Sequence, residues 1–208
     1  MYGEDDVAGL HDYMGANAER LAAQYESGSF EEIHRSWLGY LPQKGARVVD
    51  IGAGSGRDAY ALRVRGFVVA AVEPSSDMIM QAKLRHGDSD IEWIQDHLPC
   101  LKSLVTGGRT FDLLLLSAVW MHLDANERAV GMRTLTGLMN PGAITVITLR
   151  HPADSSRHMF DVDPNETIQA ARGHGLHAFL NESARDPVAE WGRHEVSWSL
   201  LGFQRDPA

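Results

Sequence analysis

The chain has 208 residues, 44% of them hydrophobic and 23% charged, which is typical of one globular domain with a substantial core. Its net charge of −9 disfavours nucleic acid as a partner, because affinity for phosphate backbones comes largely from clustered Lys and Arg. The single cysteine, Cys100, excludes an internal disulfide and a cysteine-cluster metal site. The acidic N-terminus has no secretory pattern and the apolar runs are too short to cross a bilayer, so we expect a cytoplasmic protein with no membrane partner.

Residues 7 to about 41 are predicted to be mostly helical, because apolar and aromatic side chains such as Tyr13 and Tyr25 recur at helical spacing. Pro42 ends this region before the first strand. The region does not fit a repeating strand–helix unit, so we expect residues 1–44 to form a helical cap. This cap would pack on a single domain made of residues 1–208. Its inward aromatic rings would belong to the core or line a pocket.

From residue 47 onward, strand and helix patterns alternate, which predicts a mainly parallel sheet with helices on both faces. No helix pattern separates the last two strands, so we expect a loop between them and an antiparallel pairing. The predicted strands are Arg47–Ile51, Phe67–Glu73, Ile91–Ile94, Phe111–Ser117, Ala143–Leu149, His177–Leu180 and Val196–Gly202. The predicted helices are Arg57–Arg65, Asp77–His86, Leu98–Val105, Asn126–Met139 and Pro164–His174, with capping boxes at Asp124–Glu127 and Asp163–Glu166.

The most informative stretch is the one that begins at Asp50, where a short apolar strand meets three glycines and then a helix. Backbone N–H groups at a helix N-terminus bind polar or anionic ligand groups. A dinucleotide fingerprint has a third glycine where this chain has Arg57, and the carboxylate of Asp50 would repel a phosphate but suits an amino group. The spacing Gly52-x-Gly54-x-Gly56 resembles motif I of the class I S-adenosylmethionine (SAM)-dependent methyltransferases.

This resemblance extends from about Tyr25 to Phe203, although only the glycine motif is specific. It implies an α/β fold, a three-layer Rossmann-like sandwich whose seven-stranded sheet has the order 3-2-1-4-5-7-6 with the last strand antiparallel. It also implies SAM as cofactor, S-adenosylhomocysteine (SAH) as product, and a small-molecule acceptor. Motif I would hold the methionine half of SAM, with Asp50 orienting it.

Two further acids follow the next two predicted strands. Glu73 lies roughly 20 residues beyond the glycine turn, where an acid binds both ribose hydroxyls, although an acid at a strand end also caps helices. The resemblance places Asp96 as the acceptor for the adenine amino group, and the alternative is a solvated loop acid. It places Met78 against the adenine, where the alternative is an ordinary core methionine. With Asp50, these acids would line one crevice at the carboxyl edge of the sheet.

The fourth and fifth predicted strands end in the candidate residues for catalysis and acceptor binding. By resemblance, the cofactor's methyl group meets the acceptor at the segment that begins with Ser117. This segment lacks the Asp/Asn-Pro-Pro-aromatic pattern of nucleic-acid amino-methyltransferases. Candidate acceptor contacts are Tyr25, Trp120 and Arg150, although large aromatic side chains are more often simply packed. His122 and His151 are the catalytic candidates, and His151 is favoured because it directly follows a strand.

Three alternatives stay open at this point. Ten histidines show no metal-binding motif, so we expect no metal site. An NAD-dependent oxidoreductase would need a glycine at position 57 and a Tyr-x-x-x-Lys motif, and the sequence has neither. A non-catalytic SAM-binding protein of the same fold remains the main competitor. The pattern leaves open which atom accepts the methyl group, with nitrogen or oxygen favoured, and which oligomer forms.

Overall fold

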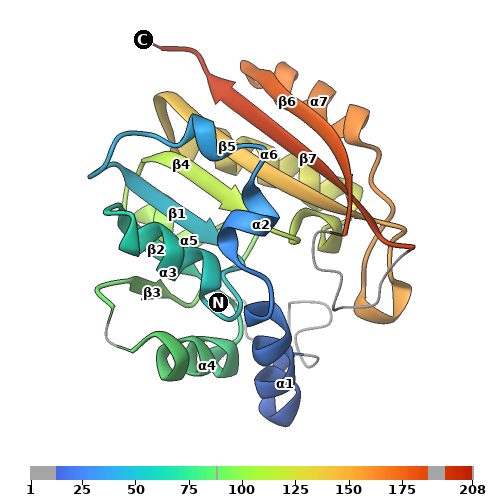
Figure 1. Ribbon diagram of the computed structural model, residues 1–208. Coiled ribbons are helices and arrows are strands. Elements are labelled where there is room, and N and C mark those ends of the chain that lie inside the picture. Colours follow the sequence, from blue (N-terminus) through green and yellow to red (C-terminus); the bar gives the residue numbers. More distant parts are fainter. Residues whose placement is uncertain (1–12, 88, 187–194, 208) are drawn as a thin grey trace.

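The computed structural model describes residues 13–87, 89–186 and 195–207 (Figure 1). Seven strands form one sheet in the order β3-β2-β1-β4-β5-β7-β6, which confirms the predicted topology. Neighbouring strands from β3 to β5 are parallel, and β7 is antiparallel to both β5 and β6. The strands are β1 (Arg47–Ile51), β2 (Val68–Val72), β3 (Glu92–Ile94), β4 (Phe111–Leu116), β5 (Met139–His151), β6 (Leu176–Arg185) and β7 (Ser197–Arg205).

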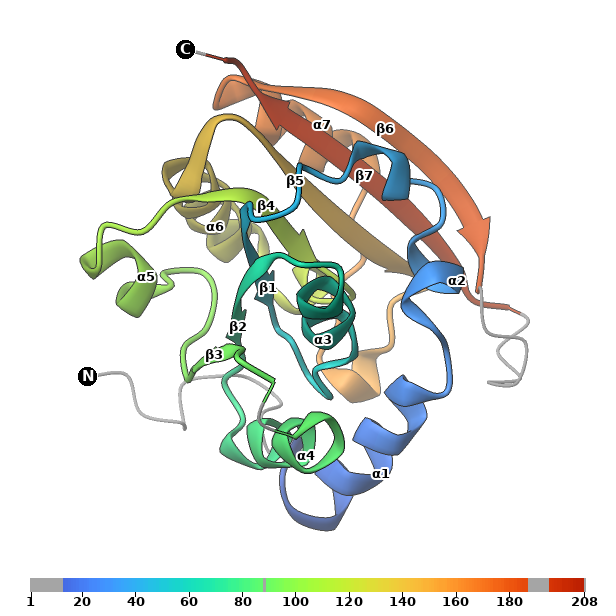
Figure 2. The same cartoon turned by 60° about the vertical axis from the view of Figure 1, so that its left-hand side comes forward.

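Helices cover both faces of this sheet (Figures 1 and 2). Side chains alternate between the two faces of a strand, so Leu114 of β4 joins a buried cluster with α6, whereas Leu113 joins one with α3. The apolar run of β4 is therefore buried on both sides, as expected for a central parallel strand. The helices are α1 (Gly15–Glu26), α2 (Phe30–His34), α3 (Arg57–Val64), α4 (Ser76–His86), α5 (Lys102–Thr106), α6 (Ala125–Leu138) and α7 (Pro164–Gly173).

Local capping signals explain where two helices begin. In α6, the Asp124 side chain accepts from the Glu127 amide and the Glu127 side chain accepts from the Asp124 amide, which confirms the predicted capping box. At α7, Asp163 is the cap, but it accepts from the Asn165 amide and no reciprocal bond from a glutamate forms. The second predicted box is therefore a simple cap.

Three predicted strand or helix boundaries are wrong by four residues or more. β6 continues to Arg185, because it pairs with β7 as far as Ser197; the polar residues taken for a loop are those of an exposed edge strand. β5 begins at residue 139 rather than 143, and α5 begins at residue 102 rather than 98. In the N-terminal region, α1 packs on α4 and α2 packs on α3, and the predicted helical residues 7–12 lie outside the described residues.

Candidate active site

A cavity of about 1020 Å³ lies at the carboxyl edge of the sheet. Small-molecule sites commonly measure roughly 300–1,000 Å³, so this cavity has room for a cofactor and a small acceptor together. Nine predicted site residues line it, namely Tyr25, Asp50, Gly52, Gly54, Glu73, Asp96, Ser117, His122 and Arg150. The other four, Gly56, Met78, Trp120 and His151, are not part of the lining.

The glycine turn brings β1 against the segment that follows β4. Gly52 has φ +74°, and a Cβ atom there would lie 2.4 Å from the side chain of Val119. Only a glycine allows both this backbone conformation and this close approach. The segment after β4 is itself constrained, because Ala118 has φ +61° and its amide donates to the Thr148 hydroxyl at 2.7 Å. These two constraints hold the glycine turn in one position next to Ser117.

Asp50 carries a buried carboxylate that lacks a complete set of partners. The residue is 1% exposed, and among the described residues its Oδ2 atom has no hydrogen-bond donor. Burial, followed by the charge of Asp58, raises the pKa of Asp50 well above its usual range. A buried, unpaired acceptor in a cavity wall suits a ligand group that donates hydrogen bonds, such as an amine.

Glu73 bridges two backbone segments at the end of β2. One carboxylate oxygen accepts from the Gly54 amide at 2.9 Å and the other from the Ser75 amide at 3.0 Å. Burial raises the pKa of Glu73 to about 7, and these two amide bonds oppose the increase. Each oxygen retains a free lone pair, so the carboxylate is able to accept two further bonds from a ligand.

Asp96 lines the cavity, whereas Met78 does not. Asp96 accepts from the His97 amide at 2.8 Å and from the Ser103 amide at 2.7 Å, which anchors the start of α5. Its carboxylate also lines the cavity. Met78 is fully buried against Ala18 and Ala22 of α1, behind the lining. The pattern that put Met78 on the correct helix did not show that α1 would cover it.

A network of buried hydrogen bonds lies next to the glycine turn, and it was not predicted from the sequence. Asp58 accepts from the guanidinium of Arg57 at 2.7 Å and from Nε2 of His34 at 2.8 Å. Trp37 donates to Nδ1 of His34 at 3.1 Å, so the ring proton of His34 is on Nε2. Arg57, which occupies the place of a third glycine, also donates to the Tyr25 carbonyl at 2.8 Å. This hydrogen-bond network links α2, α3 and the end of α1.

Two tyrosines and an arginine close the cavity from the N-terminal side. Arg157, in the loop after β5, donates to the Tyr25 hydroxyl at 2.8 Å and to the Tyr13 hydroxyl at 3.3 Å. Burial is the main cause of the raised pKa of Tyr25, so its hydroxyl stays protonated. We name Tyr13, Tyr25 and Arg157 the tyrosine–arginine clasp.

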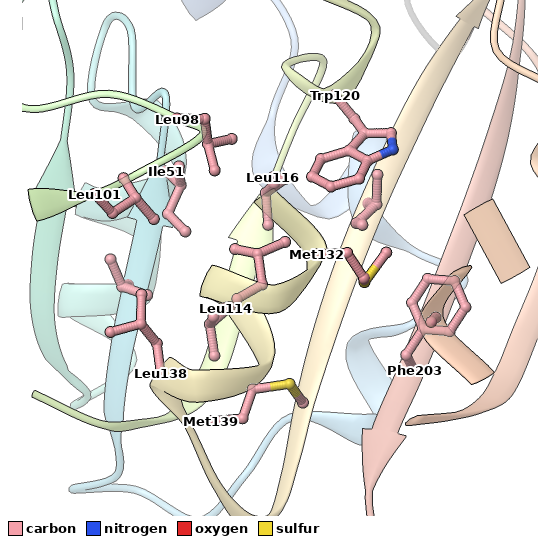
Figure 3. Packing of buried hydrophobic residues seen from close by; sticks show 14 of the residues in the cluster. Ile51, Leu98, Leu101, Leu114, Leu116, Trp120, Met132, Leu138, Met139 and Phe203 are labelled. Atoms are coloured by element: carbon pink, nitrogen blue, oxygen red, sulfur yellow. The ribbon is translucent and has the colours of Figure 1, made fainter. Parts of the chain in front are cut away.

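The residues predicted for catalysis and acceptor binding fall into two groups, those that line the cavity and those that do not. His122 lines the cavity, and burial together with the charge of Arg157 lowers its pKa to about 4. His151, the favoured histidine, is instead within hydrogen-bond distance of the Ser199 hydroxyl at 3.0 Å and does not line the cavity. Trp120 is 1% exposed in the same buried cluster as Leu116 and Met132, so it does not stack on a ligand (Figure 3).

The lining contains further residues that were not predicted. Thr148 and Leu200 lie on the same face of the sheet as Arg150 and Trp198, and all four line the cavity. Because side chains alternate along a strand, Thr148 can be predicted to lie on the same face as Arg150, two residues later. The place of Trp198 can be known only from the pairing of β5 with β7. Among the described residues, no group of three His, Cys, Asp or Glu side chains is placed to hold a metal ion. No helix in the described part of the chain is long and apolar enough to cross a membrane.

Comparison with known families decides the class of the protein. Residues 18–186 match the family described as "Methyltransferase domain". The chain belongs to this methyltransferase family. This match supports the class that motif I indicated and does not support the nicotinamide-dependent alternative.

The individual relatives of this chain are distant in sequence. It is similar to glycine N-methyltransferase of Mus musculus, with 26% identity over 167 residues, 66% of this chain and 57% of the mouse enzyme. It is also similar to a cypemycin N-terminal methyltransferase of Streptomyces, with 27% identity over 128 residues, 59% of this chain and 49% of that protein. The chain thus spans about half the length of these relatives.

A solved structure shares the fold. Phosphoethanolamine N-methyltransferase 2 of Haemonchus contortus, in complex with phosphomonomethylethanolamine and SAH, superposes with a TM-score of 0.72 and 14% identity. The match covers all of this chain and 61% of that one. At this identity the likeness shows the fold alone, which agrees with the sheet order found here.

Proposed function

We propose that this protein transfers a methyl group from SAM to a nitrogen atom of a small molecule. The observation that carries the proposal is one cavity that joins the candidate cofactor residues at one end to His122 and Arg150 at the other. Two relatives support nitrogen, because one is named a glycine N-methyltransferase and the other a cypemycin N-terminal methyltransferase. The acidic chain supports a small acceptor rather than nucleic acid.

The residues at the cofactor end fit SAM. The unpaired carboxylate oxygen of Asp50 suits the amino group of the methionine half, and Ser117 lies beside the turn that would cradle it. Glu73 would accept from the two ribose hydroxyls, since both its oxygens keep free lone pairs. Asp96 would accept from the adenine amino group. Met78, which lies behind the lining, would support this wall rather than contact adenine.

SAM supplies a methyl group that is already activated for displacement, so the protein's task is to position the acceptor and exclude water. His122 is placed to do this. With a pKa of about 4 its ring is neutral at physiological pH and takes up protons poorly, and backbone hydrogen bonds to Arg157 and His158 hold it in place. A neutral imidazole that donates through one nitrogen keeps a lone pair on the other. We therefore assign His122 to orient a neutral amine by accepting its N–H, and we assign His151 a structural bond to Ser199.

Calorimetric titration with SAM, SAH and NAD tests the cofactor, and a screen of amines and alcohols with isotope-labelled SAM tests the transfer. We expect binding of SAM and SAH but not of NAD, and label on nitrogen. Binding of NAD, or of none of the three, would overturn the proposal. Binding of SAM with label only on oxygen would retain the enzyme class and reject nitrogen as the acceptor.

A matched pair of histidine variants tests the orienting role. His122→Phe is expected to lower kcat by about 10–100-fold, because misplacement of a reacting atom by roughly 1 Å has an effect of that size. His122→Gln should recover part of this loss, since its amide oxygen accepts an N–H. His151→Gln is the control and should change kcat little. Equal losses at His122 and His151 would contradict the assignment.

A further inference from the structure

The two ends of the cavity differ in charge. The cofactor end carries the carboxylates Asp50, Glu73 and Asp96. The acceptor end, on the side of β5 and β6, contributes Arg150 and Arg185, and Arg35, Arg57, Lys102 and Arg157 also line the cavity. Arg150 and Arg185 therefore bring two positive charges to this end of the cavity in a chain with a net charge of −9.

The acids near the acceptor end already have partners. Asp124 and Glu127 also line the cavity, but each side chain accepts from the other's backbone amide in the capping box of α6. Their geometry is therefore fixed by the helix start, and the arginines opposite are not paired with them. The ion pairs within 4 Å among the described residues include neither Arg150 nor Arg185. Asp154, whose pKa is lowered mainly by its hydrogen bond with Ser156, is also influenced by the charge of Arg150.

Two donors on the floor of this end lack acceptors. Arg150 of β5 pairs with Trp198 of β7, so the two side chains lie next to each other on the face of the sheet that forms the cavity wall. In the described structure, neither Nε of Arg150 nor Nε1 of Trp198 has a hydrogen-bond partner, and both atoms are buried. An unsatisfied buried donor costs about 1–3 kcal/mol, so such groups normally have a function or a missing partner.

Arg150 has donors to spare. One Nη atom donates to the Pro152 carbonyl, which holds the guanidinium in place at the end of β5. A guanidinium has five N–H donors in a rigid fork that matches a carboxylate or a phosphate. Its fixed position beside Trp198 thus provides a preformed site for an anion.

We infer that the Arg150–Trp198 corner binds the anionic group of the methyl acceptor, a carboxylate or a phosphate. This inference rests on the proposed function and adds a substrate class to it, a small amine that also carries an anion. Arg150 provides the charged contact and Trp198 a neighbouring donor. Arg185 attracts the anion to this end of the cavity.

Matched pairs of ligands test this inference on the SAH-loaded protein. Glycine is compared with glycinamide, and phosphoethanolamine with ethanolamine, because each pair differs in the anionic group and keeps the amine. We expect the anionic member of at least one pair to bind ten-fold or more tightly than its neutral partner, in calorimetry or NMR titration. The pair that shows the difference identifies a carboxylate or a phosphate. Equal binding within both pairs, or no binding of either anion, would overturn the inference.

Three variants locate the site. Arg150→Gln should weaken the anionic ligand at least ten-fold and raise KM rather than lower kcat. Trp198→Phe keeps an aromatic ring but removes the indole N–H donor, and should weaken binding of the anionic ligand about three-fold or more. Arg133→Gln, an exposed arginine on α6, is the control and should change nothing. Unchanged anion binding in Arg150→Gln would refute the assignment.

SAH affinity, measured in the same samples, separates this inference from the proposed function. Wild-type protein and all three variants should bind SAH equally, because the corner is at the other end of the cavity. If the wild-type protein did not bind SAH, the proposed function would be wrong. If it bound SAH but did not discriminate between the anionic and neutral ligands, only the inference about the Arg150–Trp198 corner would be wrong.

Discussion

We predict that Glu73 makes cofactor binding depend on pH. Since burial raises its pKa to about 7, the group is largely protonated at pH 6 and largely ionised at pH 8. Ribose hydroxyls need acceptors, and the ionised carboxylate provides more of them. Affinity for SAH should therefore fall as the pH decreases through 7, reaching about ten-fold weaker at pH 6 than at pH 8 by proton linkage.

Calorimetry across this pH range measures the effect, and Glu73→Gln is the control. The amide cannot titrate, so this variant should bind SAH weakly and with little dependence on pH. A wild-type affinity that stays constant between pH 6 and pH 8 would show that Glu73 does not titrate as described or does not contact the cofactor.

Gly52 is the residue at which the turn tolerates a side chain least. Gly52→Ala places a Cβ atom against Val119 as well as straining the backbone, whereas Gly45→Ala at φ +87° has open space around its Cβ. Both variants should lose about 1 kcal/mol or more from the positive φ. Only Gly52→Ala should also lose SAH affinity, by more than ten-fold. Urea unfolding and calorimetry measure the two effects, and equal SAH affinity in both variants would contradict this account of the turn.

Helix α1 is held over the cavity by contacts from three parts of the chain. The Gly15 amide donates to Asp77 at 2.6 Å, Arg57 donates to the Tyr25 carbonyl, and the tyrosine–arginine clasp joins α1 to the loop after β5. These contacts connect the two segments that border the cavity. We expect the clasp to slow the release of a bound cofactor.

Tyr25→Phe tests the clasp, because it removes the hydroxyl that accepts from Arg157 and keeps the ring. SAH should dissociate several-fold faster, with a change in unfolding free energy of about 1 kcal/mol, the net value of one hydrogen bond. Tyr60→Phe on α3, whose ring stacks on His86, is the matched control and should leave the dissociation rate unchanged. Stopped-flow displacement measures the rate. Equal rates for wild type and Tyr25→Phe would exclude a role for the clasp in release.

At the scale of the whole molecule, one buried charge joins the N-terminal helices to α3. Asp58 is 4% exposed, and although burial acts against its ionisation, Arg57 and His34 outweigh this and lower its pKa. Removing one member of a buried ion pair leaves an uncompensated charge and typically costs about 3–5 kcal/mol. Asp58→Asn should lower the free energy of unfolding by an amount of that order.

Urea denaturation measures this loss against an exposed pair. Asp90, with 83% of its side chain exposed, pairs with Arg63 at 2.9 Å. Asp90→Asn should cost less than about 1 kcal/mol, because solvent screens exposed ion pairs. If the two variants lost a comparable amount of unfolding free energy, the hydrogen-bond network through Asp58 would not stabilise the packing of α2 and α3.

Local patterns were sufficient for most of the framework and for the cofactor end. A glycine turn, a strand end and a capping box are properties of neighbouring residues, so Asp50, Glu73 and the start of α6 were predictable without knowing what packs against them. The carboxyl ends of parallel strands meet at one edge, which is why the acids of three strands were correctly expected in one crevice. The sheet order followed from the family resemblance.

Which side chains reach the proposed acceptor end of the cavity depends on the tertiary structure. His122 rather than His151 reaches the cavity, and Trp120 enters the core, because the chain turns sharply after β4 and the side chains of β5 alternate between two faces. Trp198 meets Arg150 only through the register of β7 on β5. Sequence alone thus determined the fold class, through the family resemblance, and brought the three acids of the proposed cofactor site to one edge of the sheet, through short-range spacing. Which side chains surround the acceptor depends on pairings between residues far apart in the chain, and only the folded structure provides these.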